Sequence, residues 1–407
     1  MTTLAQTAPV PSGFPRVVNL LLNAGHAIDH MFLLIFATAV ASVAAEFGYA
    51  DWTDLMPYSV GAFALFGLGA LPAGRLGDLW GRRVMMIIFF LGMGVAAVLV
   101  SLTQDAWQLA AALTLLGAFA AIYHPVGIPM LVQNVPNPGA VIGLNGLAGN
   151  LGIAVAALAT GFLVKWIGWR AAFAIPGLVS VACGIVFAMA CPKETEAPSK
   201  RKGGKAKVSL TPEMLIRAFA VMTAAAAVST VLFNFTTNGN AQLLSEGFKG
   251  LIEDPAIIGT LLATIYAIAS LAQIVVGRLI DTMPFKPLQL WMSVAQVPLL
   301  IFAAHTQDWW LFAALLAVMV FIFGSIPFTD AMIVRYVDDR LRSRVAGMRL
   351  TVAFGFSSGA VWVLGPLVKG IGFSNALWIM AGIAAIKAAI VLLLPDEPTV
   401  AADAANG

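Results

Sequence analysis

One apolar stretch near the N-terminus carries three titratable side chains. The segment NAGHAIDHMF holds His26, Asp29 and His30. Residues three and four positions apart lie on the same face of a helix, so His26 is expected beside both Asp29 and His30. Histidine changes its charge near neutral pH and can exchange a proton with a carboxylate. The trio therefore predicts a proton-binding site; the alternative is a closed Asp–His hydrogen bond that only fixes helix packing.

A second polar group interrupts another apolar stretch, AIYHPVGIP, where His124 lies between Tyr123 and Pro125. Proline removes a backbone donor and tends to kink a helix, which leaves backbone polar groups open to a ligand. We expect His124 and Tyr123 to contact a substrate there. The alternative is a simple kink with a core histidine.

Neutral hydrogen-bonding groups and two charges complete the candidate binding residues. Asn150 lies in GLNGLAGNLG, and Asn234 and Asn238 lie in FNFTTNGN. Asp330 is a candidate for an ion pair or a second proton site, and Arg349 could attract an anion. For both charged residues, a salt bridge between helices is the alternative role.

These residues need helices to position them, and the composition indicates membrane-spanning ones. The chain is 60% hydrophobic and 11% charged, with a mean hydropathy of +0.90. A bilayer core requires about 20 apolar residues per helix, and β-barrel strands would alternate apolar and polar residues instead. We therefore expect an all-α polytopic membrane protein with twelve transmembrane helices. The expected helices are 17–45, 56–76, 84–103, 106–131, 140–165, 169–190, 213–243, 255–280, 287–304, 308–333, 344–369 and 373–394.

The distribution of basic residues predicts the orientation of these helices. Of the 23 Lys and Arg residues, 19 fall on the side of the two termini and 4 on the opposite side. The positive-inside rule then places both termini in the cytoplasm, as expected for a protein of the bacterial cytoplasmic membrane. The basic run KRKGGKAK is interpreted as a topology signal and flexible linker, so no nucleic-acid partner is expected.

The chain contains an internal repeat. GRLGDLWGRR begins at Gly74 and GRLID begins at Gly277, an offset of 203 that Asp78 and Asp281 share. Parallel repeats of this kind place a substrate site near the bilayer midplane, between two halves that rock against each other. The expected segments are a cytoplasmic tail at 1–16, a six-helix bundle at 17–191, a linker at 192–212, a second bundle at 213–395 and a cytoplasmic tail at 396–407.

The repeated motif predicts a conformational gate in the loop after the second helix. Gly74 and Gly81 permit close packing and a sharp turn, and Asp78 can accept hydrogen bonds from Arg82 or lie near a helix N-terminus. Such contacts would form when this side is closed and break when it opens. The gate residues are Gly74, Asp78, Gly81, Arg82 and Arg83 in the first copy and Gly277, Arg278 and Asp281 in the second.

At this motif the chain resembles a known family. GRLGDLWGRR is similar to the loop signature of the major facilitator superfamily, and GRLIDTMPFK resembles its degenerate second copy. The resemblance covers nearly the whole chain. It implies two six-helix bundles and secondary active transport of a small molecule across the lipid bilayer, with Asp78, Arg82 and Arg83 locking one conformation.

A narrower resemblance is to the fosmidomycin-resistance branch of that superfamily. It rests on GHAIDHM, IYHP and LAGNLGIAVAALATG, and it implies proton-coupled efflux of small polar or amphiphilic compounds, as in drug resistance. The residues that match are His26, Asp29, His124, Pro125, Gly149, Asn150 and Gly152. The Gly-Pro pair common in the fifth helix of drug–proton antiporters is absent after Gly152. Uptake of a small organic acid by proton symport therefore remains the alternative, and a membrane enzyme or receptor is a remote one.

The remaining expectations concern partners and cofactors. We expect a monomer that uses protons and a small-molecule substrate, is not an enzyme and needs no cofactor or metal. Cys183 and Cys191 are interpreted as packing residues. Lys387, near an expected helix end, is predicted to extend its charged end to the membrane surface.

Overall fold

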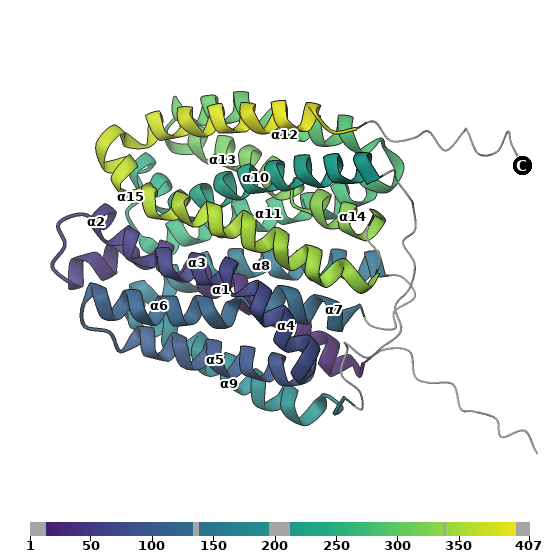
Figure 1. Cartoon of the computed structure of the whole chain (residues 1–407). Coiled ribbons are helices and arrows are strands. Elements are labelled where there is room, and N and C mark those ends of the chain that lie inside the picture. Colours follow the sequence, from purple (N-terminus) through teal and green to yellow (C-terminus); the bar gives the residue numbers. More distant parts are fainter. Residues whose placement is uncertain (1–13, 133–137, 195–211, 337–338, 396–407) are drawn as a thin grey trace, which may run out of the picture.

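Long apolar segments form helices that run side by side through the whole molecule (Figure 1). The computed structural model describes residues 14–132, 138–194, 212–336 and 339–395, although the side chains of several residues in these ranges, including Asp281 and Asp330, are not described. The helices are α1 (Arg16–Glu46), α2 (Trp52–Leu55), η1 (Met56–Ser59), α3 (Val60–Leu68), α4 (Ala70–Trp80), α5 (Arg82–Ser101), α6 (Ala106–Ala120), η2 (Tyr123–Gly127), α7 (Ile128–Leu131), α8 (Pro138–Trp166), α9 (Trp169–Ala190), α10 (Pro212–Gly247), α11 (Pro255–Thr282), α12 (Phe285–Ala304), α13 (Asp308–Gly324), α14 (Pro327–Tyr336) and α15 (Asp339–Leu392).

The number of membrane crossings agrees with the all-α polytopic fold. In the described part of the chain, ten helical segments are long and apolar enough to cross a membrane, and a bent pair makes an eleventh. The last of these spans 46 residues, Gly347–Leu392, and its backbone is non-helical at Gly372, where φ is 77°. At ~1.5 Å per residue, each arm of this segment is long enough to cross the bilayer. Gly372 therefore divides α15 into the expected eleventh and twelfth helices.

Three of the expected continuous helices are broken instead. The breaks come shortly before Pro72, Pro125 and Pro327, and the first bends its helix by 44°. Proline lacks the amide hydrogen, and its ring clashes with the carbonyl four residues earlier, so the preceding helix ends there. At Pro125 the chain widens into the short π-helix η2, a rare turn that is frequent at functional sites.

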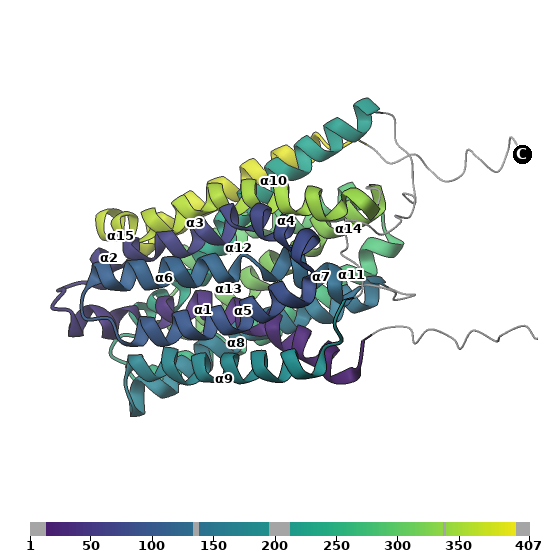
Figure 2. The same ribbon diagram turned by 60° about the horizontal axis from the view of Figure 1, so that its bottom comes forward.

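The first and second halves of the chain occupy different parts of the bundle. In Figure 1, α1–α9 fill the lower part of the bundle and α10–α15 the upper part, and Figure 2 shows the same helices from a second side. The start of α1 and the end of α15 lie at one end of the bundle, called here the terminal end. The opposite end, which holds α2 and Gly372, is called the distal end. The linker expected at 192–212 and both expected tails lie almost entirely outside the described residues.

Glycines bring α1 and α8 into close contact. A side chain at Gly152 would collide with the backbone of Ala27, and one at Gly149 would overlap the ring of His26. Small residues permit such approach between membrane helices, where van der Waals packing replaces the hydrophobic effect. The two glycines thus fix how near α8 lies to the histidine face of α1.

Candidate functional site

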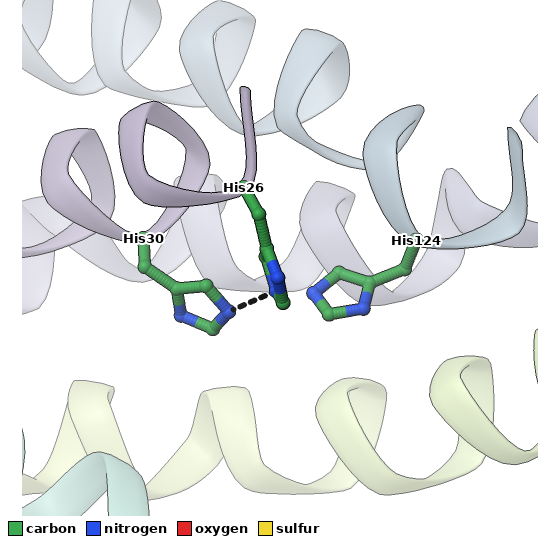
Figure 3. Close-up of side chains that lie close together, drawn as sticks. All are labelled: His26, His30 and His124. Atoms are coloured by element: carbon green, nitrogen blue, oxygen red, sulfur yellow. Dashed lines mark hydrogen bonds between the residues drawn. The ribbon is translucent and has the colours of Figure 1, made fainter. Parts of the chain in front are cut away.

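Three histidines from two separate segments of the chain meet inside the bundle. The chain has four histidines, and the nearest ring nitrogens of His26, His30 and His124 all lie within 4.8 Å of one another. The first two project from α1 and the third from η2, and all three rings point into one space (Figure 3). His26 is ten residues into α1, or ~15 Å along it, so the cluster lies deep between the two ends.

The orientation of His26 is fixed by hydrogen bonds and stacking. Its Nδ1 lies 2.7 Å from the backbone oxygen of Asn145, and its Nε2 lies 3.1 Å from Nε2 of His30. The ring stacks on Tyr123, with centroids 4.8 Å apart and planes 16° from parallel. Because a carbonyl oxygen only accepts, Nδ1 of His26 carries the hydrogen, and Nε2 accepts one from His30.

Asp29 lies beside the cluster and is fully buried. Its Oδ2 lies 3.7 Å from Nε2 of His124, and neither of its oxygens has a hydrogen-bond partner among the residues that the structure describes. Nε2 of His124 is likewise without one in this part of the chain. Burying a carboxylate without hydrogen bonds is unfavourable unless a proton or another cation neutralises it. The arrangement is therefore chemically suited to hold a proton or a metal cation.

A polar frame from three helices supports the cluster. Tyr123 donates its hydroxyl to the backbone oxygen of Leu22 at 2.7 Å. The amide of Asn145 donates to the Tyr123 hydroxyl at 2.8 Å and to the Asn23 side chain at 3.0 Å. The sequence analysis did not place Asn145 or Asn23 in the site. Asn145 could have been found as a polar residue within an apolar helix, whereas nothing in the sequence separates Asn23 from an ordinary helix-end residue.

A small cavity adjoins the cluster at the boundary between the first and second halves of the chain. It has room for about one water molecule. Side chains from both halves line it: His30, Leu33, Leu34, Phe63, Phe66, Phe233, Asn234 and Phe354. Arg349, on α15, is close enough for its charge to act on His124. The predicted residues His30 and Asn234 therefore line the same cavity between the two halves.

Other predicted binding residues lie outside the cluster. Asn150 is buried on α8, and its amide nitrogen has no hydrogen-bond partner among the described residues. Asn238 is buried on α10 and donates to the backbone oxygen of Asn234 at 2.9 Å. The Asp330 side chain lies outside the described part, so its predicted role has no structural counterpart here.

The predicted gate loop connects α4 and α5 at the terminal end. A side chain at Gly74 would press on Pro125 at 3.2 Å, and Gly81 has a φ of 98°, which favours glycine. Arg82 donates to the backbone oxygen of Pro129 at 3.1 Å. Asp78 is half-buried, and no bond to it occurs within the described residues, so the expected bond from Arg82 to Asp78 is not observed.

Arg83 and the second copy of the motif differ in their surroundings. Arg83 donates from Nε to the backbone oxygen of Cys191 at 2.8 Å and from Nη2 to that of Ala188, which joins the loop to the end of α9. Gly277 has open space where a side chain would be, and Arg278 is exposed. The second copy therefore lacks the close packing seen at Gly74. The Asp281 side chain is not described.

Lys387 does not extend to the membrane surface as predicted. It is 1% exposed, and no hydrogen bond or ion pair to it is found within the described ranges. The prediction was wrong because the lysine faces the packed interior of the second half instead of the lipid. It is a buried polar residue that the sequence analysis assigned to the surface.

Comparison with known sequences identifies the family. The sequence profile of the Major Facilitator Superfamily matches residues 22–251. The chain is similar to the probable actinorhodin transporter of Streptomyces coelicolor, at 31% identity over 174 residues, which span 41% of this chain and 30% of that protein. It is also similar to the multidrug resistance protein MdtG of Escherichia coli O6:K15:H31, at 24% identity over 290 residues, or 67% of each protein.

Solved structures agree on the fold. A bacterial homolog of the human lysosomal transporter Spinster, in an inward-facing and occupied conformation, superposes with a TM-score of 0.69 at 15% identity. The superposition covers 93% of this chain and 96% of that one. The same homolog in an inward-facing and unoccupied conformation gives a TM-score of 0.63 at 14% identity. With its helices, its profile match and these neighbours taken together, the chain belongs to the Major Facilitator Superfamily and is a transporter.

Proposed function

We propose that this transporter works as a monomer in the bacterial cytoplasmic membrane and exports a small polar or amphiphilic compound in exchange for protons. The observation that carries the proposal is Asp29, a fully buried carboxylate beside His124. Ionisable groups at membrane depth are rare and commonly mark proton pathways. Both termini, and with them the terminal end of the bundle, are assigned to the cytoplasm by the excess of basic residues there.

The proposed coupling uses Asp29 as the proton carrier and the histidines as its neighbours. A protonated Asp29 is compatible with the enclosed cavity, because no charge is then left unpaired. Opening the cavity to water on one side permits release of the proton, and the substrate then binds beside the ionised group. Proton and substrate thus bind in alternation while the two halves rock between their open states.

The surroundings of the cavity favour a substrate with an apolar body and a polar or anionic group. Phe63, Phe66 and Phe233 provide apolar contacts, and Asn234 provides hydrogen bonds. Arg349 supplies a positive charge from the opposite half. A phosphonate such as fosmidomycin has the anionic group, and the relatives named for multidrug resistance and for actinorhodin fit export.

The gate is proposed to act at the terminal end. Arg82 and Arg83 bind backbone oxygens at the ends of two neighbouring helices, and these bonds hold α4 and α5 against the first half. We infer that Asp78 gains a partner only in another conformation. Gly277, Arg278 and Asp281 are assigned the corresponding, weaker role in the second half.

The first prediction concerns Asp29. The protein and its Asp29→Asn variant are expressed in a fosmidomycin-sensitive bacterium, and inhibitory concentrations are compared with an empty vector. We expect the wild type to protect and Asp29→Asn to lose protection by at least tenfold, because asparagine is isosteric but does not release a proton. Collapse of the proton gradient should abolish protection by the wild type.

Glu213→Gln, at an exposed carboxyl in the first turn of α10, is the matched control and should protect like the wild type. Membrane levels of all variants are measured by immunoblot. Full protection by Asp29→Asn would remove this residue from the coupling path.

One observation favours uptake as a second candidate. The Gly-Pro pair of drug–proton antiporters is absent after Gly152, and Arg349 beside the histidines suits a carboxylate as well as a phosphonate. If neither phosphonates nor other drugs are exported although the protein reaches the membrane, proton-driven uptake of radiolabelled small organic acids in vesicles is the next assay. Accumulation that depends on an inward proton gradient would establish symport.

A further inference from the structure

The three clustered histidines have the composition of a transition-metal site. His26 and His30 lie one turn apart on α1, and the broken segment η2 brings His124 to them from another helix. Imidazole nitrogen is a favoured ligand of Zn²⁺, Ni²⁺ and Co²⁺, whereas Mg²⁺ and Ca²⁺ favour oxygen ligands. Two ligands from one helix turn and a third from a second element form a pocket that an ion can enter from the adjoining cavity, which His30 lines.

The hydrogen bonding of His26 prepares it to bind a metal. Its Nδ1 donates to the backbone oxygen of Asn145, so the lone pair is on Nε2, which faces the other two histidines. Metal-binding histidines commonly donate their second ring nitrogen to a carbonyl or carboxylate in this way, which orients the ring. Tyr123 holds the same ring by stacking. On metal binding, His30 carries its single hydrogen on Nδ1 instead of Nε2, so that Nε2 of both His26 and His30 presents a lone pair to the ion.

Asp29 supplies a negative charge beside the histidines. Both of its oxygens and Nε2 of His124 are buried without hydrogen-bond partners among the described residues. Of these unpartnered atoms, Oδ2 of Asp29 and Nε2 of His124 lie 3.7 Å apart. A bound cation would satisfy both groups at once, which no protein group in the described part does.

We propose that His26, His30 and His124, with the Asp29 carboxylate beside His124, bind a divalent transition-metal ion of the Zn²⁺ class. Tetrahedral coordination with Zn–N bonds of about 2.0–2.1 Å requires nitrogens about 3.4 Å apart. His26 and His30 are already 3.1 Å apart. The widest separation, 4.8 Å, must shorten by roughly 1.4 Å, which rotation of the His30 and His124 side chains provides.

Metal binding goes beyond the proposed transport and does not depend on it. The charge of the bound ion lies beside the carboxylate that the proposed mechanism uses for protons, so Zn²⁺ is expected to inhibit transport. It also ties α1 to η2 within the first half of the chain. Arg349 acts on His124 from α15 and opposes any added cation, so its removal should strengthen metal binding.

The test is calorimetric titration of ZnCl₂ into the full-length protein in lipid nanodiscs, purified with an affinity tag that is cleaved off. We expect one equivalent to bind, and His124→Asn and His30→Asn each to weaken binding by at least about tenfold, as the loss of a ligand or its support does. Co²⁺ in place of Zn²⁺ should give the intense visible absorption of a tetrahedral site in the wild type and not in His30→Asn or His124→Asn. Arg349→Gln should bind Zn²⁺ more tightly than the wild type.

The fourth histidine provides the matched control. His305 is exposed at the distal end, with Nδ1 2.9 Å from the Ile301 backbone oxygen, and His305→Asn should bind Zn²⁺ like the wild type. Unchanged melting temperatures of His30→Asn and His124→Asn in the absence of metal exclude misfolding. The proposal is overturned if the wild type binds no Zn²⁺, or if His305→Asn weakens binding and His124→Asn does not. Zinc binding without proton-driven transport would refute only the transport mechanism, and the reverse result would refute only the metal site.

Discussion

At the scale of single residues, two side chains decide how the interior handles charge. Among Asp, Glu, Lys and Arg, Asp29 and Lys387 are the two residues that the described part of the structure encloses almost completely. Asp29 lies within a cluster of histidines that can neutralise or share its charge. Lys387 has no hydrogen-bonding or ionic partner in the described ranges. From these surroundings we infer a role in proton binding for the carboxylate and a stability cost for the lysine.

Replacing Lys387 by methionine should stabilise the protein. A buried charge without a partner is unfavourable, and replacing buried charged groups by apolar residues of similar volume is often neutral or stabilising by about 1–4 kcal/mol. We expect a higher melting temperature of Lys387→Met in detergent, measured by intrinsic fluorescence, and unchanged transport. Lys387→Gln, which keeps a polar end, should gain less. A lower melting temperature for Lys387→Met would show that the lysine has a stabilising partner.

At the scale of elements, the site depends on two departures from a regular helix bundle. The broken helix at Pro125 turns His124 toward α1, and the glycines of α8 let that helix approach α1 closely enough for Asn145 to reach His26. Neither departure removes a membrane-spanning segment. Each changes where a side chain points, and this is what assembles the cluster.

Gly152→Ala should therefore disturb the site, whereas Gly143→Ala on the same helix should not. A methyl group at Gly152 collides with the Ala27 backbone, which cannot rotate away, while Gly143 has open space around it. Overpacking costs typically ~1–3 kcal/mol, whereas Gly→Ala in a helix otherwise stabilises by up to about 1 kcal/mol.

The measurement is the melting temperature together with Zn²⁺ affinity for both variants. Gly152→Ala should lower both quantities, and Gly143→Ala should leave the affinity unchanged and keep or raise the melting temperature. Equal behaviour of the two variants would contradict close packing of α1 on α8.

At the scale of the whole molecule, charged pairs connect the first and second halves of the chain at the distal end. Lys165 on α8 pairs with Asp254, which precedes α11, and Lys369 on α15 pairs with Asp54 on α2 at 2.5 Å. Trp52 and Phe373 stack beside the second pair, with ring centroids 6.1 Å apart. In the described structure this end is therefore held together, and opening it requires that both pairs separate.

The pair at Asp254 predicts a pH dependence. Hydrogen bonding from Lys165, and from the Ala256 amide, lowers the pKa of Asp254 below its usual value. The pair therefore stabilises the folded state fully above the unfolded-state pKa of aspartate, about 3.9. This stabilisation is lost as the pH falls through the lower pKa of the folded state. We expect the melting temperature to fall in this acidic range in the wild type.

Asp254→Asn should lose that part of the pH dependence, because asparagine keeps the helix cap but has no charge. Both partners are partly exposed, so the effect should be small and should decrease in high salt. Melting curves from pH 6 to about pH 3, at two salt concentrations, provide the test. An identical pH profile for Asp254→Asn would show that the pair does not stabilise the fold.

The sequence alone was sufficient to predict the apolar helical segments and the family resemblance, and it singled out His26, Asp29, His30 and His124 as candidate site residues. These properties depend on composition, on hydrophobic segments of bilayer length and on short motifs, all of which are local in the chain. His26, Asp29 and His30 were predictable as neighbours because helix periodicity places them on one face. The pairing of Asp29 with His124, the roles of Asn145 and Asn23, and the burial of Lys387 were not predictable. They depend on how α1, η2 and α8 pack and on which face of α15 points inward. Hydropathy does not distinguish a helix face in contact with lipid from one in contact with other helices, because both faces are apolar.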